Sequence, residues 1–346
     1  MVLAGDKDCL GIVWRSLRQC ITNFIVFCFV MCVTSAISFA DEEAILTSKI
    51  NEENTQLRTW FKLREQNEPV VQFSVGLGYR NDNIKWSVAN DSVDIASELN
   101  WNETGISQLL LGATVFLDKH WFLKGGFATG VVVSGNNRDS DYAGSNRTQE
   151  FSRSDSKSGG ATWDYTIAFG PRLDRFELSN EVTFYISPMI GYSYNQQDLT
   201  IFDGEQKIPF SVPLTGLNNH YDARWMGPWF GFEILLVMYN QMSLVARTEI
   251  HSAEFSAQAN WNLRNDFMHP VSFEHDATGA GLVNSISLFY NVSRNFLINS
   301  RLGYQTWNAQ TGEELTYFSS GVVEKRELKR IEWDSMSISF GALYQF

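Results

Sequence analysis

Apolar and polar residues alternate along the last segment of the chain, from Glu332 to Phe346. The apolar face of this segment holds six alternate residues: Met336, Ile338, Phe340, Ala342, Tyr344 and Phe346. The opposite face carries mainly serine, glycine and glutamine. Because successive side chains of a strand point to opposite faces, the pattern predicts a β-strand with one apolar and one polar side.

The same alternation recurs along the chain and predicts nine further strands. They centre on residues 71–79, 94–117, 123–133, 163–169, 182–194, 230–238, 247–251, 282–292 and 296–304. Short turns are predicted at 118–120, 240–242 and 293–295. Long polar loops are predicted at 134–160, 258–276 and 311–330, with another around Asp203 to Pro213. The expected fold is therefore all-β, with about ten antiparallel strands and connections that alternate between short and long.

The N-terminal region has the pattern of a secretory signal peptide. An apolar run over residues 21–40 follows Lys7, Arg15 and Arg18, and it ends in small residues directly before three acidic ones. This arrangement predicts cleavage after residue 40, and an uncleaved membrane anchor is the alternative. Residues 41–69 are polar, with apolar residues at helical spacing, and predict a short amphipathic helix. That segment could be a periplasmic spacer, a partner-binding helix or a plug of the barrel lumen.

Composition narrows the class of protein. All four cysteines lie within the predicted leader, so we expect no disulfide and no cysteine metal site in the exported chain. The formal net charge is −12 and no basic cluster is present, which argues against nucleic acid as a partner. The five scattered histidines show no metal-ligand spacing, and we expect no cofactor and no metal.

The strand pattern and the leader together favour a membrane location. Beyond the leader no stretch is long and apolar enough for a membrane helix, so a spanning chain must form a closed barrel. Short turns alternating with long polar loops, and aromatic residues near strand ends, are typical of outer-membrane barrels. An alternating final strand that ends on Phe resembles the closing strand of such barrels. A soluble β-sandwich would need a second sheet to cover each apolar face. We therefore predict a transmembrane barrel over residues 70–346 in the bacterial outer membrane, in contact with its lipid.

About ten strands predict a narrow lumen, filled mostly by side chains rather than an open general pore. The inward faces of the strands carry charged residues: Lys124, Glu233, Arg247, Glu249, His251 and Arg301. Buried charges must be paired or hydrated. A structural charge network and a conducting path both fit this set, and we also interpret the serines of the last strand as lumen packing beside Arg301 and Glu249.

Several motifs resemble those of the omptins, a family of ten-stranded outer-membrane proteases. Their order along residues 70–346 and the loop lengths agree with that family. The matching segments are Ser97-Glu-Leu-Asn-Trp101, Asp139-Ser-Asp141-Tyr142, Trp163-Asp-Tyr165, Gly191-Tyr192 and Met226-Gly-Pro-Trp-Phe-Gly231. The acidic chain is also similar to outer-membrane proteins of chlamydia-like bacteria.

The omptin resemblance implies a proteolytic site with two carboxylates on one side of the mouth and an Asp–His pair on the other. Asp139 and Asp141 match the first pair, and without the resemblance they would be interpreted as loop aspartates. The Asp-x-His position falls on Asn260-Trp261-Asn262, and Asn cannot act as a base. Nearby Asp266, His269 and His275-Asp276 are the remaining candidates. The lipopolysaccharide-binding motif of that family reads Tyr192-Ser-Tyr-Asn-Gln196 here and lacks its Glu and Arg.

Three hypotheses about function follow. The first is a non-proteolytic barrel whose loops at 134–160 and 259–275 bind a protein or peptide at the cell surface. The second is a narrow, porin-like channel. The third is an omptin-type endopeptidase that uses a rearranged site of Asp139, Asp141 and His269. The missing base favours the first hypothesis, which is not an enzyme.

Overall fold

The computed structural model describes residues 70–346, with gaps at 118–119, 172–175, 178–182 and 239–240. The predicted signal peptide at 1–40 and the predicted helical segment at 41–69 lie outside the described residues. Within the described part of the chain, no helix is long and apolar enough to cross a membrane.

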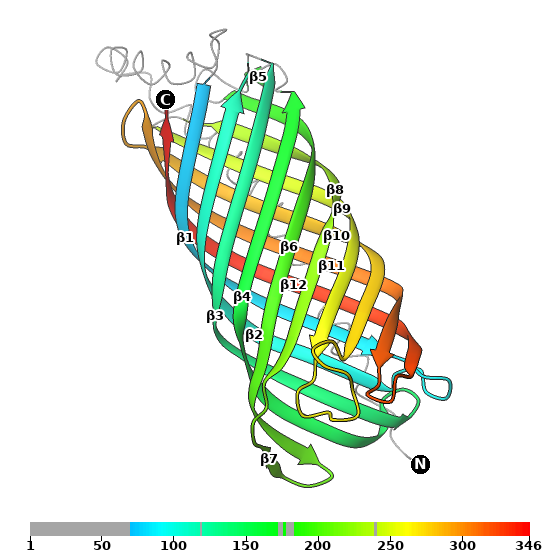
Figure 1. The fold of residues 1–346 in the computed structure, drawn as a ribbon. Coiled ribbons are helices and arrows are strands. Elements are labelled where there is room, and N and C mark those ends of the chain that lie inside the picture. Colours follow the sequence, from blue (N-terminus) through cyan, green and yellow to red (C-terminus); the bar gives the residue numbers. More distant parts are fainter. Residues whose placement is uncertain (1–69, 118–119, 172–175, 178–182, 239–240) are drawn as a thin grey trace, which may run out of the picture.

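The described chain consists of ten long strands and two very short ones. The strands are β1 (Val70–Val88), β2 (Ser97–Phe116), β3 (Trp121–Gly144), β4 (Thr148–Pro171), β5 (Phe176–Glu177), β6 (Thr183–Ile208), β7 (Val212–Leu214), β8 (Asn219–Val237), β9 (Met242–Asn260), β10 (Phe273–Asn291), β11 (Phe296–Tyr317) and β12 (Val323–Gln345). The ten long strands pair antiparallel with their neighbours, and β1 pairs with both β2 and β12. The sheet therefore closes into a tilted barrel, which confirms the predicted fold class (Figure 1).

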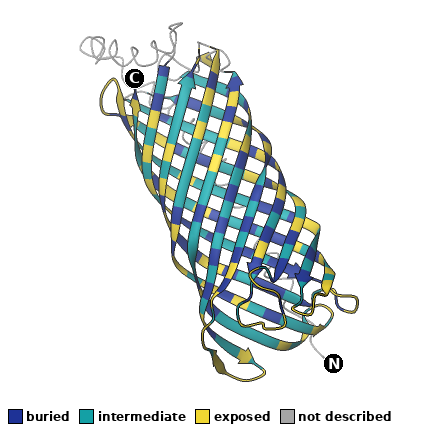
Figure 2. Cartoon of the chain, in the orientation of Figure 1, coloured by how far each residue is buried: buried dark blue, intermediate teal, exposed yellow. Residues whose placement is uncertain are grey.

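A band of apolar side chains covers the outside of the barrel near the C-terminal end of the chain. On β1 the outward Phe73, Val75 and Leu77 are 52%, 50% and 69% exposed. On β12 the outward residues include Met336, Ile338 and Phe340, as the alternation predicts. More and less exposed residues alternate along much of β1 and β12 (Figure 2). Large apolar side chains that remain exposed on the outer face of the barrel are suited to contact lipid.

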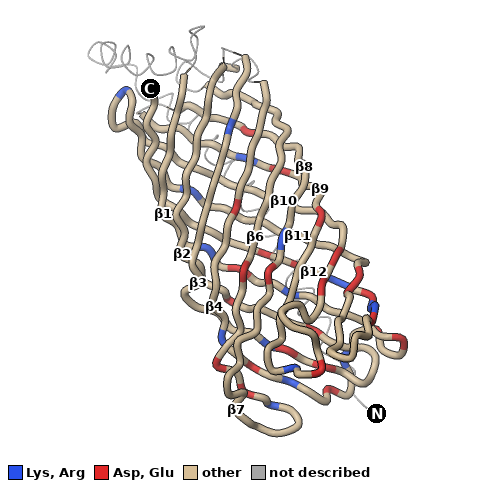
Figure 3. The backbone as a smooth tube through the Cα atoms, viewed as in Figure 1, with Lys and Arg blue, Asp and Glu red and all other residues tan. Residues whose placement is uncertain are grey.

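The outer surface changes character beyond this band. On β1, Leu77 and Tyr79 are followed on the same face by Asn81, Asn83 and Lys85. Acidic and basic residues gather at the end of the barrel that carries β7 (Figure 3). The strands thus continue past the lipid into water. Because outer-membrane barrels have long loops outside and short turns inside, this is the extracellular end.

The predicted loop at 134–160 is wrong, because this segment is a β-hairpin. β3 continues to Gly144 and β4 begins at Thr148. Outside the lipid, both faces of a strand can be polar, so the alternation that predicts a membrane strand disappears while the hydrogen-bonded pairing continues. The predicted loops at 258–276 and 311–330 shorten for the same reason, to residues 261–272 and 318–322.

The lumen of the extracellular half is packed with apolar side chains. Seven large residues of one buried cluster are named here the aromatic cluster: Trp86, Trp101, Tyr221, Trp225, Phe255, Trp307 and Trp333. Trp307 stacks on Trp333 with ring centroids 5.7 Å apart. A Cβ at Gly281 would lie 2.4 Å from the Trp307 ring, so only glycine lets this indole pack against β10. The aromatic cluster fills the lumen between the membrane and the extracellular loops.

Candidate functional site

Asp139 and Asp141 lie side by side on β3 and point into the extracellular mouth of the barrel. In the strand register Asp139 is opposite Leu99 of β2, and Asp141 is opposite Ser97. Leu99 is fully buried in the apolar cluster of the lumen, so the face that it shares with Asp139 is the inner one. The structure therefore brings together the two carboxylates that the sequence singled out, directly above the aromatic cluster.

Burial, and then repulsion by Asp141, raises the pKa of the Asp139 carboxyl to about 7. A hydrogen bond from the Trp261 side chain and the charge of Arg264 act in the opposite direction. Burial also raises the pKa of Asp141, against hydrogen bonds from Ser97 and Ser152. Two like charges in a half-buried site favour a shared proton near neutral pH.

Trp261 fills the position across the mouth from Asp139. β9 ends at Asn260, with Ala259 buried on its inner face and Asn260 on the opposite face. The next inner side chain is Trp261, which is 8% exposed and hydrogen-bonds to Asp139. An indole N–H donates a hydrogen bond and cannot accept a proton, so the group that faces Asp139 is not a base.

The two asparagines on either side of Trp261 have structural hydrogen bonds. The Oδ1 atom of Asn262 accepts a bond from the Asn218 backbone N–H at 2.8 Å, and its Nδ2 donates to the Gly216 carbonyl at 2.7 Å. Its own backbone N–H donates to Asn219 Oδ1 at 2.9 Å. Asn260 Oδ1 lies 2.7 Å from His269 Nδ1. These residues fix loop 261–272 over the mouth and to the turn before β8.

The other candidate residues contact different partners in the loop and in the lumen. Asp266 is exposed and forms two hydrogen bonds with Arg264, at 2.9 and 2.7 Å. His269 contacts Asn260, as described above, and Asp276 faces outward. His275 is buried, with Nδ1 3.0 Å from the Tyr221 hydroxyl and Nε2 2.8 Å from Glu314. The cations that act on Asp139 and Asp141 are Arg264 and Arg326, so no histidine is among them.

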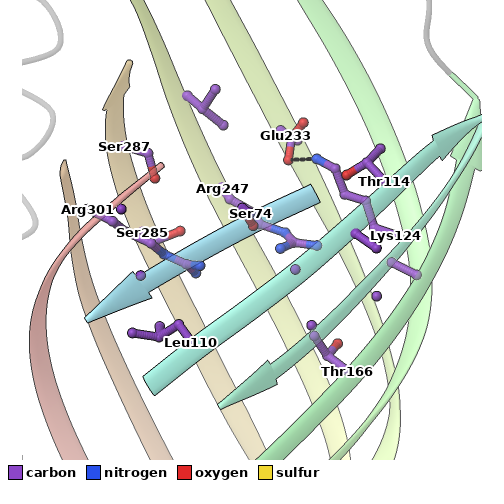
Figure 4. Close-up of a pocket in the computed structure, with 18 of the residues that line it drawn as sticks. Ser74, Leu110, Thr114, Lys124, Thr166, Glu233, Arg247, Ser285, Ser287 and Arg301 are labelled. Carbon is purple, nitrogen blue, oxygen red and sulfur yellow. Dashed lines mark hydrogen bonds and ion pairs between the residues drawn. The ribbon is translucent and has the colours of Figure 1, made fainter. Parts of the chain in front are cut away.

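Below the aromatic cluster, the lumen carries the predicted charges around a cavity of about 380 Å³ (Figure 4). Lys124 forms an ion pair with Glu233, and Arg247 Nε lies 2.8 Å from Glu249. His251 lies between Glu249 and Ser193, at 3.1 and 3.0 Å. Of the inner serines of β12, Ser339 is among the walls of this cavity, together with Arg301 and Glu249. Within the described residues, no group of three acidic or histidine side chains could hold a metal ion.

The sequence interpretation missed the aromatic cluster and the Tyr221–His275–Glu314 chain. A signal was present, because Trp333 and Trp307 follow the same two-residue spacing as the inner polar residues of their strands. From the sequence, the face opposite the lipid was expected to be polar along the whole strand.

Comparison with known proteins agrees with this architecture. A family model described as Protochlamydia outer membrane protein matches residues 74–346. The chain belongs to the Protochlamydia outer membrane protein family. Membership in this family, and the barrels that resemble it, place the protein in the bacterial outer membrane. Among curated protein sequences, none matches the chain.

One solved structure shows the same fold for this member of the Protochlamydia outer membrane protein family. The outer membrane protease OmpT from Escherichia coli aligns with a TM-score of 0.65 at 14% identity, covering 82% of this chain and 100% of OmpT. The outer membrane protein OprG from Pseudomonas aeruginosa aligns with a TM-score of 0.35 at 11% identity, covering 82% and 98% of the two chains. At this identity, the OmpT match supports the omptin-like fold alone.

Proposed function

We propose that this barrel is a non-proteolytic surface protein whose extracellular loops bind a protein or peptide partner. The observation that carries the proposal is the Trp261 side chain, which hydrogen-bonds to Asp139 where a proteolytic site would need a base. Asp139 and Asp141 correspond to one half of the site that the omptin resemblance implies, whereas Asn260 and Asn262, at the position of the other half, fix a loop. Because the aromatic cluster fills the extracellular half of the lumen, the rim is the part of the described barrel that we expect to meet a partner.

The β6–β7 hairpin is the most prominent feature of that rim. It projects beyond the neighbouring strands at the extracellular end (Figure 1). Phe210 and Val212 in this hairpin are 68% and 42% exposed. Phe151 is also exposed and lies on β4, which pairs with β6 near the hairpin. Exposed aromatic residues beyond the lipid are of the type that contributes most to protein interfaces.

Selection from a displayed peptide library tests the binding proposal. We expect refolded wild-type protein to enrich peptides that a Phe210→Ser/Val212→Ser variant does not retain. Val322→Ser, an exposed apolar residue in the β11–β12 turn, is the matched control and should retain them. Enrichment no greater than that on an unrelated barrel, or enrichment unaffected by the hairpin variant, would contradict the proposal.

An endopeptidase is the second candidate, because the pKa of Asp139 is raised to about 7, close to the pH at which a general base operates. Incubation of the refolded protein with a dibasic peptide library separates the two functions. We expect no cleavage. Cleavage that Asp139→Ala abolishes would replace the binding proposal with a proteolytic one.

A narrow channel is the third candidate, and the charged cavity of the lumen is the observation in its favour. The aromatic cluster opposes it, since these side chains fill the extracellular half of the lumen. In planar bilayers we expect the purified barrel to show no discrete conductance steps. Regular steps from pure protein would revive the channel hypothesis.

A further inference from the structure

The outer wall of the barrel contains a hollow of about 800 Å³ within the lipid band. It lies across the neighbouring strands β1, β2, β3 and β4 (Figure 1). Its floor is formed by Ala113 of β2 and Gly125 of β3, which lie directly opposite each other in the strand register. A Cβ at Gly125 would have no atom of a described residue within 4 Å, other than those of its chain neighbours. The space above this pair of small residues is therefore open.

Large apolar side chains bound this floor on two sides. In the row that crosses the strands, Phe73 of β1 lies opposite Ala113, and Ile167 of β4 lies opposite Gly125. Phe73 and Ile167 are 52% and 53% exposed, so both extend outward from the sheet. The two small residues therefore lie at the bottom of a trough between two large ones.

A third wall bounds the hollow toward the extracellular end. Leu111 of β2 lies opposite Phe127 of β3, and Phe127 lies opposite Tyr165 of β4. The rings of Phe127 and Tyr165 pack with their centroids 4.9 Å apart, which holds this wall in place. All three residues line the hollow. Its shape is thus set by strand pairing and packed rings rather than by a loop.

The hollow lies in the periplasmic part of the lipid band. Phe73 lies three residues after Val70, where β1 begins at the periplasmic end, and the outer face of β1 stays apolar up to Tyr79. Hydrocarbon surrounds the barrel at this depth, so the molecules that can fill the hollow are the lipids of the periplasmic leaflet. Walls without contacting atoms would lose their dispersion attraction. The hollow is therefore suited to a lipid chain.

We propose that this hollow holds one acyl chain of a phospholipid from the periplasmic leaflet, as a bound lipid that stays with the barrel. Lipid chains are as apolar as the outer wall, so a preference for one place on it comes from packing rather than from the hydrophobic effect. A chain on a convex wall contacts protein on one side. A chain seated between Phe73 and Ile167 contacts protein on several sides and gains more dispersion attraction. The volume lies within the range of small-molecule sites, and the site is separate from the extracellular rim.

The test uses the full barrel, refolded into phosphatidylethanolamine vesicles, extracted into detergent and measured by native mass spectrometry. We expect one phospholipid to remain bound at collision energies that remove the others. Ala113→Leu/Gly125→Leu fills the floor with side chains suited to a lipid-facing strand, and it should lower the lipid-bound fraction about fivefold or more, because the chain loses its seat. Vesicles of phosphatidylglycerol should give a bound fraction within about twofold, since the chain makes the contacts.

A matched variant and a crosslinking probe keep the result interpretable. Ala246→Leu makes the same kind of change on the lipid face of β9, opposite Ile234 and Ile286, and should retain the lipid as the wild type does. A phospholipid with a diazirine in its acyl chain should crosslink to the walls of the hollow in the wild type and not in the filled variant. Folding of each variant is checked by heat-modifiable migration on gels. The proposal is overturned by no retained phospholipid, by equal retention in the folded filled variant, by loss of the lipid on the change of headgroup, or by a dimer of the barrel in place of the lipid adduct.

Discussion

Asp139 shows how one covering side chain sets the chemistry of the mouth. Trp261 covers this carboxyl and donates a hydrogen bond to it, while Asp141 adds a second negative charge beside it. Burial keeps water from the Asp139 carboxyl, and the charge of Asp141 repels a negative charge on it. Both effects favour the protonated form, so the pKa of Asp139 rises to about 7. A carboxyl that is half-protonated at neutral pH makes the stability of the barrel depend on pH.

Asp139→Asn is expected to change that dependence. Because the folded pKa of about 7 lies above the ordinary 3.8, the folded state binds more protons between these values, and stability falls as pH rises through them. Asn does not ionise, so the variant should gain about 1–2 kcal/mol over the wild type at pH 8 and nothing at pH 4. Urea unfolding in detergent at several pH values measures this. Asp155→Asn, on the outer surface, is the control and should keep the wild-type slope.

Asn262 is the residue that fixes the loop over the mouth. It joins loop 261–272 to the turn before β8 through three hydrogen bonds. Asn262→Ala removes the two made by its side chain and should cost about 1–3 kcal/mol, because the backbone partners lose their bonds. Limited proteolysis should then cut the loop several-fold faster. Asn308→Ala, with one long contact to Glu332, should leave the cutting rate unchanged. An unchanged rate in Asn262→Ala would contradict this role.

At the scale of the element, each long strand has two parts with different surroundings. The periplasmic part has lipid outside and the charged cavity inside. The extracellular part has water outside and the aromatic cluster inside. β1 shows the change within one strand, from Leu77 to Asn83 on the outer face. The position on β1 at which the outer face changes from apolar to polar residues therefore marks the edge of the lipid.

Arginine substitutions on β1 test this boundary. Leu77→Arg puts a charge into the lipid band and is expected to destabilise the barrel by about 2–4 kcal/mol. Asn83→Arg, six residues further on the same face, should cost less than about 1 kcal/mol. Refolding equilibria in lipid vesicles measure both. Equal costs at the two positions would place the boundary elsewhere.

The alternation of apolar and polar residues predicted the part of each strand that crosses the membrane. It did not predict that the strands continue beyond the lipid. Apolar residues at every second position around Phe73 and Ile338 are required by lipid, so the pattern there is strong. Around Asp139 no such requirement exists, and a paired strand has the composition of a loop. Asp139 and Asp141 were found through their motif, whereas Trp261 was missed because its role depends on a contact across the mouth that no local pattern shows.

At the scale of the whole molecule, the lumen is divided into two chambers of opposite character. The extracellular half is filled by the aromatic cluster, and the periplasmic half holds the cavity with Arg301. Trp307 lies at their junction, stacked on Trp333 and 4.7 Å from the His251 ring. The extracellular half of the lumen is therefore filled by aromatic side chains, whereas the periplasmic half holds a cavity bordered by a smaller apolar cluster that includes Phe116 and Phe122.

Removal of two indoles should open the closed side. Trp225→Ala/Trp307→Ala is expected to cost several kcal/mol, since each such truncation costs about 3–5 kcal/mol. The folded fraction should show conductance steps in planar bilayers that the wild type lacks. Trp121→Ala, on the outer surface, is the control and should remain silent. A silent double variant would show that other side chains seal the lumen.

The length of the strands beyond the lipid also sets the height of the rim. From Tyr79 to the end of β1 at Val88 the strand continues for nine residues, which at 3.3 Å per residue and a tilt near 40° raises the rim by about 20 Å. A paired sheet is stiff, so the loops are held at that distance by a rigid collar. The collar separates them from the lipid headgroups, and it gives large molecules in the medium access to the projecting β6–β7 hairpin.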